Sequence, residues 1–128
     1  MILAIDCSAS LCAASVHDEA ANVELGRCVL DLGKGHAERL MAVIADALKA
    51  GGVNYAGLST IAVSVGPGSF TGVRVGVSAA RGLALALKIP AIGVTTLEAL
   101  AQQARQAFPG RAVLVALDGG RDEIHAAL

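Results

Sequence analysis

The sequence predicts an α/β domain built on one mixed five-stranded sheet. It contains 128 residues, of which 55% are hydrophobic and 16% are charged, and this composition is typical of a globular chain and excludes a disordered one. Three apolar segments with short connections come first, and segments with the periods of helices and strands then alternate. A chain of this length buries roughly 65–70% of its unfolded surface, so it forms a core without disulfides or metal.

The first third of the chain predicts an antiparallel meander followed by a helix. The strands are Ile2–Ser8, Leu11–His17 and Val23–Leu32, and the turns between them are short, as antiparallel pairing allows. From His36 onwards apolar residues recur at helical spacing, until Gly51-Gly52 ends the run. These patterns predict three strands and a first helix.

The middle of the chain predicts alternating strands and helices. The uncharged run Thr60–Val65 indicates a buried strand, Gly66-Pro67-Gly68-Ser69 indicates a turn, and the apolar segment after it indicates a helix that ends near Leu87. Ile89–Val94 indicates a second short buried strand. Such strands pair in parallel through helical crossovers.

The last elements are a helix and a hairpin. Thr95-Thr96-Leu97-Glu98 has the pattern of a capping box, which opens a helix that runs to about Ala107. Ala112–Asp118 and Ile124–Leu128 predict a hairpin that resembles a restart of the three-strand pattern. We therefore expect residues 1–109 to form one lobe and residues 110–128 to be the first hairpin of a truncated second lobe.

The order of elements, βββαβαβα, predicts the ribonuclease-H-like, or actin-like, layout. This is a mixed five-stranded sheet with helices on both faces, found in ribonuclease-H-like nucleases and in the lobes of actin-like kinases and chaperone ATPases. A nuclease of this layout needs several carboxylates around two metal ions. Because no Asp or Glu occurs between Lys49 and Glu98, the sequence disfavours a nuclease.

Two turns are candidates for binding a nucleotide or a phosphate. Asp6 ends the first strand, where its carboxylate could hold Mg²⁺ while Ser8 meets a phosphate, or where it could hydrogen-bond its own turn. The second turn offers Gly66, Gly68 and Ser69 at a helix N-terminus, which suits either an anion or close packing of the backbone. The second turn is not a Walker A loop, because no Gly-Lys-Ser/Thr ends it.

The helix after the glycine turn predicts a partner surface. Small residues recur at every fourth position and cations at every seventh, and nearly all other residues are apolar. The sheet covers only one side of this helix, so either the first helix or another protein covers its other side. The cations are Arg74, Arg81 and Lys88. We expect the interface to consist of His36, Leu40, Gly72, Gly76, Ala80, Arg81 and Ala84.

The sequence contains no pattern that supports catalysis or metal binding. The histidines lack partners at metal-site spacing, the hydroxyl residues of the turns lack an assignable base, and the cysteines lack zinc-ligand spacing. The residues concerned are His17, His36, His125, Ser8, Ser69, Thr71, Cys7, Cys12 and Cys28. We therefore expect no catalytic residue, no metal and no required cofactor, and we expect the cysteines to be buried thiols of a reducing compartment.

Charge and hydropathy set expectations for partners and location. The net charge of −1 and the absence of Trp give neither a global field nor a stacking platform for nucleic acid. The N-terminus reaches Asp6 too early for a signal peptide, and the uncharged stretch Ala50–Val73 is too rich in polar and turn residues for a membrane span. We expect a cytoplasmic protein without a membrane partner.

Four segments of the chain closely resemble the TsaB (also YeaZ) family. They read MILAIDCS at 1–8, HAERL at 36–40, GPGSFTGVR at 66–74 and GVTTLE at 93–98. The third is highly specific to the family, and the resemblance covers nearly the whole chain in order. The family usually shows Asp-Thr-Ser where this chain has Asp6-Cys7-Ser8.

The resemblance implies an actin-like fold and a non-catalytic role in making threonylcarbamoyladenosine beside the anticodon of tRNA. The partners that it implies are a second copy of the chain when alone, a TsaD-like catalytic subunit and a TsaE-like ATPase, with tRNA held indirectly. ATP or ADP is then expected only in the assembled complex. One alternative is a phosphotransferase-like lobe that binds a nucleotide through Asp6, Ser8 and the turn at 66–69. The other is an M22-type peptidase-like protein, which the lack of paired zinc ligands disfavours.

Overall fold

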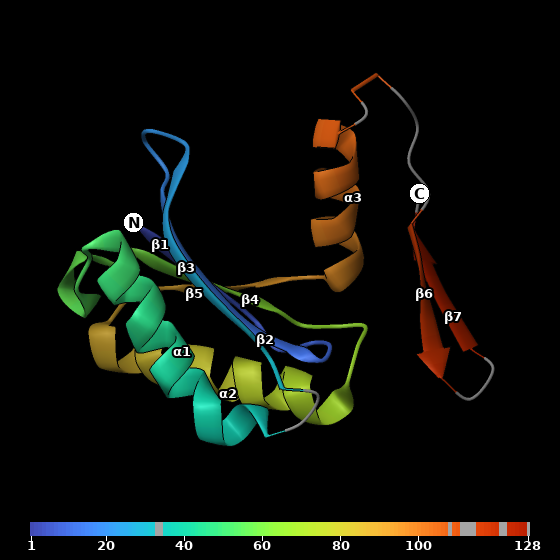
Figure 1. Ribbon diagram of the computed structural model, residues 1–128, viewed down its shortest axis with the longest axis horizontal. Coiled ribbons are helices and arrows are strands. Elements are labelled where there is room, and N and C mark those ends of the chain that lie inside the picture. Colours follow the sequence, from blue (N-terminus) through green and yellow to red (C-terminus); the bar gives the residue numbers. More distant parts are fainter. Residues whose placement is uncertain (33–34, 108, 111–114, 121–122, 128) are drawn as a thin grey trace.

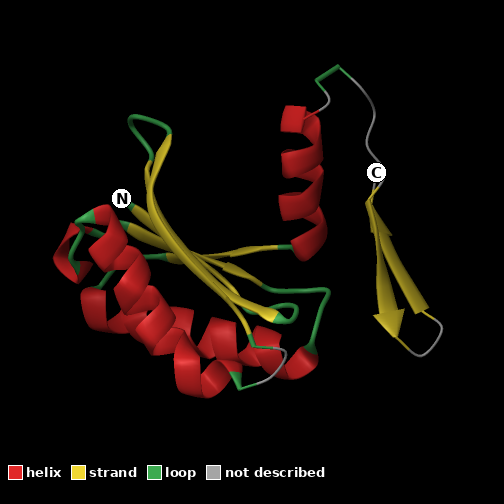
Figure 2. Cartoon of the chain, viewed as in Figure 1, coloured by secondary structure: helices red, strands yellow, loops and turns green. Residues whose placement is uncertain are grey.

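A computed structural model of the chain shows the five-stranded mixed sheet that the sequence predicts (Figures 1 and 2). It describes residues 1–32, 35–107, 109–110, 115–120 and 123–127. The strand order is β3-β2-β1-β4-β5. The strands are β1 (Ile2–Asp6), β2 (Leu11–Asp18), β3 (Val23–Asp31), β4 (Thr60–Ser64) and β5 (Ala91–Val94).

β1 lies at the centre of the sheet and fixes its mixed character. It pairs antiparallel with β2, where Ile2 lies opposite His17, and parallel with β4, where Ile2 lies opposite Thr60. β2 pairs antiparallel with β3, and β4 pairs parallel with β5. The predicted meander, the two parallel additions and the fold class are therefore confirmed.

Three α-helices accompany the sheet in the described part of the chain: α1 (His36–Gly51), α2 (Phe70–Leu87) and α3 (Thr96–Ala107). Gly52 ends α1 in the left-handed conformation with φ 66°, as the glycine pair predicts. The capping box of α3 is also confirmed. Thr95 Oγ1 accepts a hydrogen bond from the Glu98 amide at 3.0 Å, and the Glu98 carboxylate accepts one from the Thr95 amide at 3.3 Å.

The main core lies between one face of the sheet and the pair α1 and α2, which Figure 1 shows together below the sheet. Side chains of a strand alternate between its two faces, so every second residue of the central strands points into this layer. Helix α1 contributes a stripe at helical spacing. Fully buried members of the core are Leu3, Val16, Leu40, Val43, Ile44 and Ile61.

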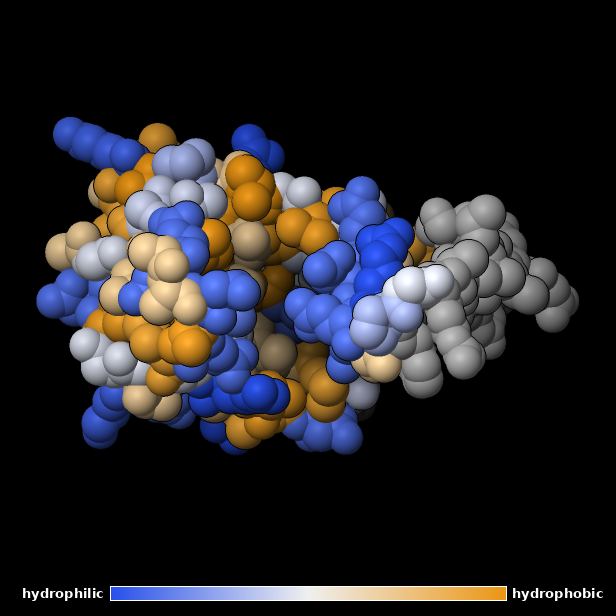
Figure 3. Space-filling model, turned by 90° about the horizontal axis from the view of Figure 1, so that it is seen from above, coloured by the Kyte–Doolittle hydropathy of each residue, from blue (hydrophilic) through white to orange (hydrophobic). Residues whose placement is uncertain are grey.

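The opposite face of the sheet is shallow and carries small side chains. Helix α3 stands on this side and borders the face through Ala99. Ala4, Ala13 and Ala62 line a groove of about 290 Å³ over the strands. Figure 3 looks onto this side of the molecule and shows the hollow next to α3. Helices thus cover the first face and border the second.

The chain ends in a separate two-stranded antiparallel sheet beside α3, formed by β6 (Val115–Gly120) and β7 (Glu123–Ala127). This confirms that a hairpin follows α3, although residues 112–114 and 128 of the predicted strands lie outside the described residues. The assignment of residues 110–128 to a second lobe stays a prediction.

Candidate functional site

The Asp6 carboxylate binds its own turn and the neighbouring strand. Its Oδ1 accepts hydrogen bonds from the Ser8 amide at 2.9 Å, from the Ser8 hydroxyl at 2.6 Å and from the Ser64 hydroxyl at 2.6 Å. These bonds close the turn after β1 and tie it to the end of β4. Of the two interpretations of Asp6, the geometry matches the one in which the carboxylate hydrogen-bonds its own turn.

Two opposing effects act on the acidity of Asp6. Burial raises the pKa of this carboxyl, but the hydrogen bonds from Ser64 and Ser8 outweigh burial and hold the pKa below its usual value. The group is therefore ionised at neutral pH. Within the described residues, no group of three or more His, Cys, Asp or Glu side chains is placed to hold a metal ion.

The glycine turn packs directly on the turn that Asp6 closes. The Ser69 amide donates to the Ser8 carbonyl at 2.7 Å, and the Ser69 hydroxyl accepts from the Gly72 amide at 3.3 Å. A Cβ atom on Gly68 would overlap the Ser8 carbonyl oxygen, and one on Gly72 would overlap the Cys7 carbonyl oxygen. These glycines therefore let two backbone segments touch.

The same turn also bonds α3. The Gly66 carbonyl accepts a hydrogen bond from the Thr96 amide at 2.9 Å, and Gly66 has a φ of 100° that favours glycine. The structure thus brings Asp6, Ser8, Gly66, Gly68 and Ser69 into one region, and several of their polar atoms bond within it. Their role in binding a nucleotide stays a prediction.

The row of small residues on α2 faces the sheet. Gly72, Gly76, Ala80 and Ala84 are the buried residues of this helix. A Cβ on Gly76 would lie 3.4 Å from Val63 and 3.7 Å from the Cys7 side chain, both on the sheet side. The prediction that this row contacts a partner is wrong, because close approach of a helix to a sheet requires the same small residues.

The two predicted interface residues on α1 are also buried within the chain. His36 is 7% exposed, and its Nε2 lies 3.1 Å from the Leu11 carbonyl oxygen at the start of β2. Leu40 is 2% exposed in the core. Both residues are almost fully covered within the chain, and only Arg81 of the predicted set is exposed.

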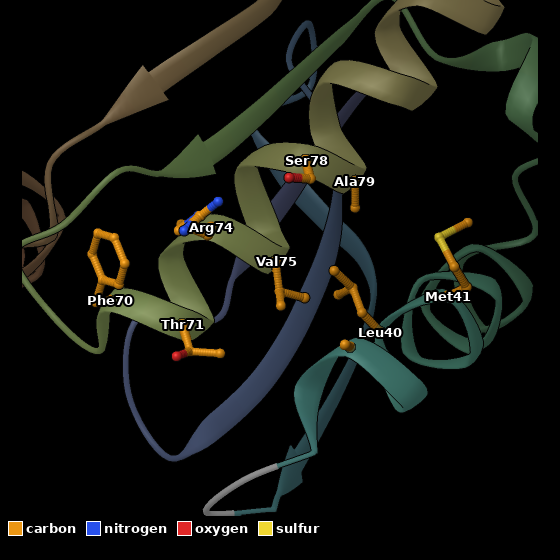
Figure 4. Close-up of a pocket in the computed structure, with 9 residues that line it drawn as sticks. Leu40, Met41, Phe70, Thr71, Arg74, Val75, Ser78 and Ala79 are labelled. Atoms are coloured by element: carbon orange, nitrogen blue, oxygen red, sulfur yellow. The ribbon is translucent and has the colours of Figure 1, made fainter.

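The accessible surface between the two helices is an apolar groove of about 460 Å³. Figure 4 shows Thr71, Val75 and Ala79 of α2 on the side that faces Leu40 and Met41 of α1. Figure 4 also shows Phe70 and Arg74 beside each other at the start of α2. The remaining lining residues are Ala37 and Ser78.

Exposed apolar side chains lie on both helices, two of them in the lining of this groove, and the predicted interface does not include them. Phe70 is 75% exposed, Leu85 is 82% exposed and Met41 is 49% exposed. The Arg74 guanidinium lies 5.3 Å from the centroid of the Phe70 ring, in cation–π contact. The sequence carries a signal that could have identified them, since these residues lie off the buried stripe of each helix.

Helix α2 is mostly apolar, although only a small part of it is buried within the chain. In the described part of the chain it is the one helix long and apolar enough to cross a membrane, and 22% of it is buried. It also connects β4 to β5 and packs its row of small residues on the sheet. We interpret its hydropathy as that of a crossover helix with an uncovered outer side.

The cysteines show no sign of a reactive thiol in the described residues. Cys7 and Cys12 are buried with their sulfur atoms 3.9 Å apart, and Cys28 is partly buried. Burial and the neighbouring Cys12 raise the pKa of Cys7 to about 12, so this thiol is protonated at neutral pH. The side chain of His125 lies outside the described part of the chain.

Comparisons with known proteins agree with the fold and the motifs. The family model described as TsaD, tRNA N6-adenosine threonylcarbamoyltransferase, matches residues 31–128. The tRNA threonylcarbamoyladenosine biosynthesis protein TsaB of Escherichia coli (strain K12) is 35% identical over 125 residues, which cover 97% of this chain and 52% of that protein. TsaB of Haemophilus influenzae is 30% identical, covering 97% of this chain and 51% of that protein.

Solved structures give the same picture. A crystal structure from Pseudomonas aeruginosa, described as an uncharacterized protein with similarity to peptidase YEAZ, matches with a TM-score of 0.88 and 34% identity. The match covers 98% of this chain and 56% of that one. The chain therefore spans about half the length of the curated relatives it matches.

The contact of Gly72 with the Cys7 carbonyl predicts opposite effects for two glycines of α2. A Cβ atom on Gly82 would enter open space, with no other atom within 4 Å, so Gly82→Ala should raise the free energy of unfolding by about 0.5–1 kcal/mol. Gly72→Ala should lower it by about 1–3 kcal/mol, because the new methyl group overlaps backbone. Urea denaturation measures both, and stabilisation by both variants would contradict the packing role of Gly72.

The lowered pKa of Asp6 predicts a pH-dependent part of the stability. A carboxyl whose pKa is lower in the folded chain stabilises it above its ordinary pKa of 3.8, and this contribution disappears as the pH falls through the folded value. Asp6→Asn should therefore be destabilised relative to the unsubstituted chain at neutral pH, with a smaller difference in acid. Urea titrations at several pH values test this, and a difference that does not change with pH would contradict it.

Proposed function

Because the chain belongs to the TsaB (YeaZ) family and matches the TsaD family model over residues 31–128, we propose that it acts as a non-catalytic subunit in threonylcarbamoyl transfer to tRNA. The relatives carry the name of tRNA threonylcarbamoyladenosine biosynthesis proteins. The proposed target is the adenosine beside the anticodon. The chain contributes a protein surface, and a TsaD-like subunit performs the transfer.

One observation supports the role of a scaffold most strongly, which is the apolar outer side of the helix pair. Phe70 of α2 and Met41 of α1 are exposed and line a groove of about 460 Å³, and Leu85 is exposed further along α2. Exposed apolar patches with a few polar neighbours are typical of protein interfaces. We place the partner contact here, on the exposed residues of α1 and α2, in place of the buried row.

The candidate partners follow from the family. A second copy of the chain occupies the groove when the protein is alone, and a TsaD-like subunit occupies it in the complex. A TsaE-like ATPase joins the assembly, and tRNA is held through the other subunits. The complex works in the cytoplasm, and the chain itself requires no cofactor.

A nucleotide-binding lobe is the second candidate, and the contacts at its proposed site disfavour it. One oxygen of the Asp6 carboxylate, Oδ1, already accepts three hydrogen bonds. The carbonyl oxygens of Cys7 and Ser8 occupy the space beside Gly72 and Gly68. The peptidase-like alternative is disfavoured because no set of metal ligands gathers in the described residues.

The proposed interface predicts that one aromatic side chain carries much of the binding. Phe70→Ala should weaken association with the TsaD-like subunit by about 2 kcal/mol, the usual effect for an aromatic residue at the centre of an interface. The stability of the chain should not change, because Phe70 is 75% exposed. Isothermal calorimetry measures the affinity, and melting measures the stability.

Ile92→Ala is the matched control, since Ile92 is 49% exposed on β5, away from the groove. We expect this variant to bind like the unsubstituted chain. Failure of the unsubstituted chain to bind the TsaD-like subunit would refute the proposed function. Equal affinities of the Phe70→Ala and Ile92→Ala variants for the TsaD-like subunit would show that the interface lies elsewhere on the chain.

A further inference from the structure

We propose that the outer side of α2 binds a partner surface with acidic side chains, and that it favours such a partner over a second copy of this chain. This inference rests on the proposed function, because it assumes that the α1 and α2 surface is an interface. The inference adds to the proposed function the chemical character of the partner that binds this surface. The observations that carry it are the position, the sign and the isolation of the cations on this surface.

Three cations form one stripe along the outer side of α2. Arg74 and Arg81 are seven residues apart, which is close to two turns of a helix, and Lys88 follows α2 as its C-cap residue with a φ of 56°. All three residues are exposed, whereas the buried row of this helix faces the sheet. The stripe therefore points away from the core, beside the exposed Phe70 and Leu85.

The surface is positive although the chain is not. Helix α2 contains no Asp or Glu, and Lys88 directly follows it. Helix α1 contains two acidic and two basic residues, Glu38, Asp46, Arg39 and Lys49, so its charges balance. The whole chain has a net charge of −1, so the positive charge of α2 is a local feature of this helix.

Within the described residues, no carboxylate forms an ion pair with the stripe. The ion pairs within the described residues are Met1 with Glu19, and Glu24 with His17 and Arg27, all of them outside α1 and α2. In the part of the chain that the structure describes, Arg74 contacts the ring of Phe70 and forms no ion pair. Cations beside an apolar surface are best matched by a partner whose carboxylates meet them when water leaves the interface.

A second copy of this chain matches the stripe poorly. In a two-fold symmetric contact the same patch of each copy meets its counterpart. Contact across α2 therefore brings the cations of both copies to one surface, where like charges repel. An acidic partner gains attraction from the same side chains, so it should displace a second copy.

Nucleic acid is another class of occupant for a basic stripe, and the surroundings of this stripe favour protein. It comprises three cations beside exposed Phe70 and Leu85 and next to an apolar groove. Binding of a nucleic acid backbone commonly uses about six to ten phosphate contacts. A short stripe at the rim of an apolar surface is typical of a protein interface.

The test reverses charge at the outer side of α2 and measures association with the TsaD-like subunit. The variants are Arg81→Glu alone and Arg81→Glu combined with Lys88→Glu. The matched control for the single variant is Arg105→Glu, since Arg105 is exposed on α3, away from the groove. Circular dichroism shows whether each variant folds, and Arg81→Gln provides a gentler substitution at the same position.

We expect the double variant to associate about tenfold more slowly at low salt, and to differ less from the unsubstituted chain at high salt. Arg81→Glu and Arg81→Gln should have intermediate effects, and Arg105→Glu should have little. Sedimentation of Arg81→Gln should show self-association equal to or stronger than that of the unsubstituted chain, because this substitution removes a charge that repels its counterpart in the second copy.

Three results would overturn the inference alone. Association of the double variant at the unsubstituted rate would do so while leaving the proposed function intact. An equal loss in Arg105→Glu and Arg81→Glu would assign the effect to net charge. Loss of tRNA retention by the assembled complex, with subunit association unchanged, would assign the stripe to nucleic acid. Absence of any complex with the unsubstituted chain would refute the proposed function together with the inference.

Discussion

The contact between the glycine turn and the turn after β1 determines how α2 is presented. The Ser69 amide bonds the Ser8 carbonyl at 2.7 Å, and Gly68 and Gly72 leave no room for a side chain against the Ser8 and Cys7 carbonyls. This contact fixes where the helix begins and which side of it meets the sheet. Four small residues then face inwards, and the apolar and basic residues face outwards.

The regular elements can be predicted from the sequence because their signals are local. Strand alternation, the glycine pair after α1 and the capping box of α3 each depend on residues a few positions apart. Local signals do not show which element or protein packs against each face. The row from Gly72 to Ala84 predicts a partner interface by its spacing, but small residues are equally required wherever a helix lies close on a sheet. The spacing of residues in the sequence identifies those that share one face of a helix, but it does not show which element or protein packs against that face.

The same reasoning explains why the interface residues predicted on α1 are buried. It also explains why the sequence left two roles open for Asp6 at the candidate nucleotide site. The helical period correctly predicts that Leu40 belongs to an apolar stripe, yet only the packing shows that α2 and the sheet cover it. His36 binds the Leu11 carbonyl, a contact between distant parts of the sequence. Asp6 could equally face a ligand or close its turn, and the three donors around its Oδ1 decide the geometry. Hydrogen bonds of this kind cannot be read from the order of residues.

The proposed role depends on the outer side of α1 and α2 being the place where this chain meets its partner, and amide hydrogen exchange can locate that contact. Exchange is compared for the chain alone and mixed with the TsaD-like subunit. We expect added protection in residues 36–51 and 70–87, with little change in β3 or β5. Protection confined to β3, β5 or the shallow face of the sheet, with none in α2, would contradict the proposed interface.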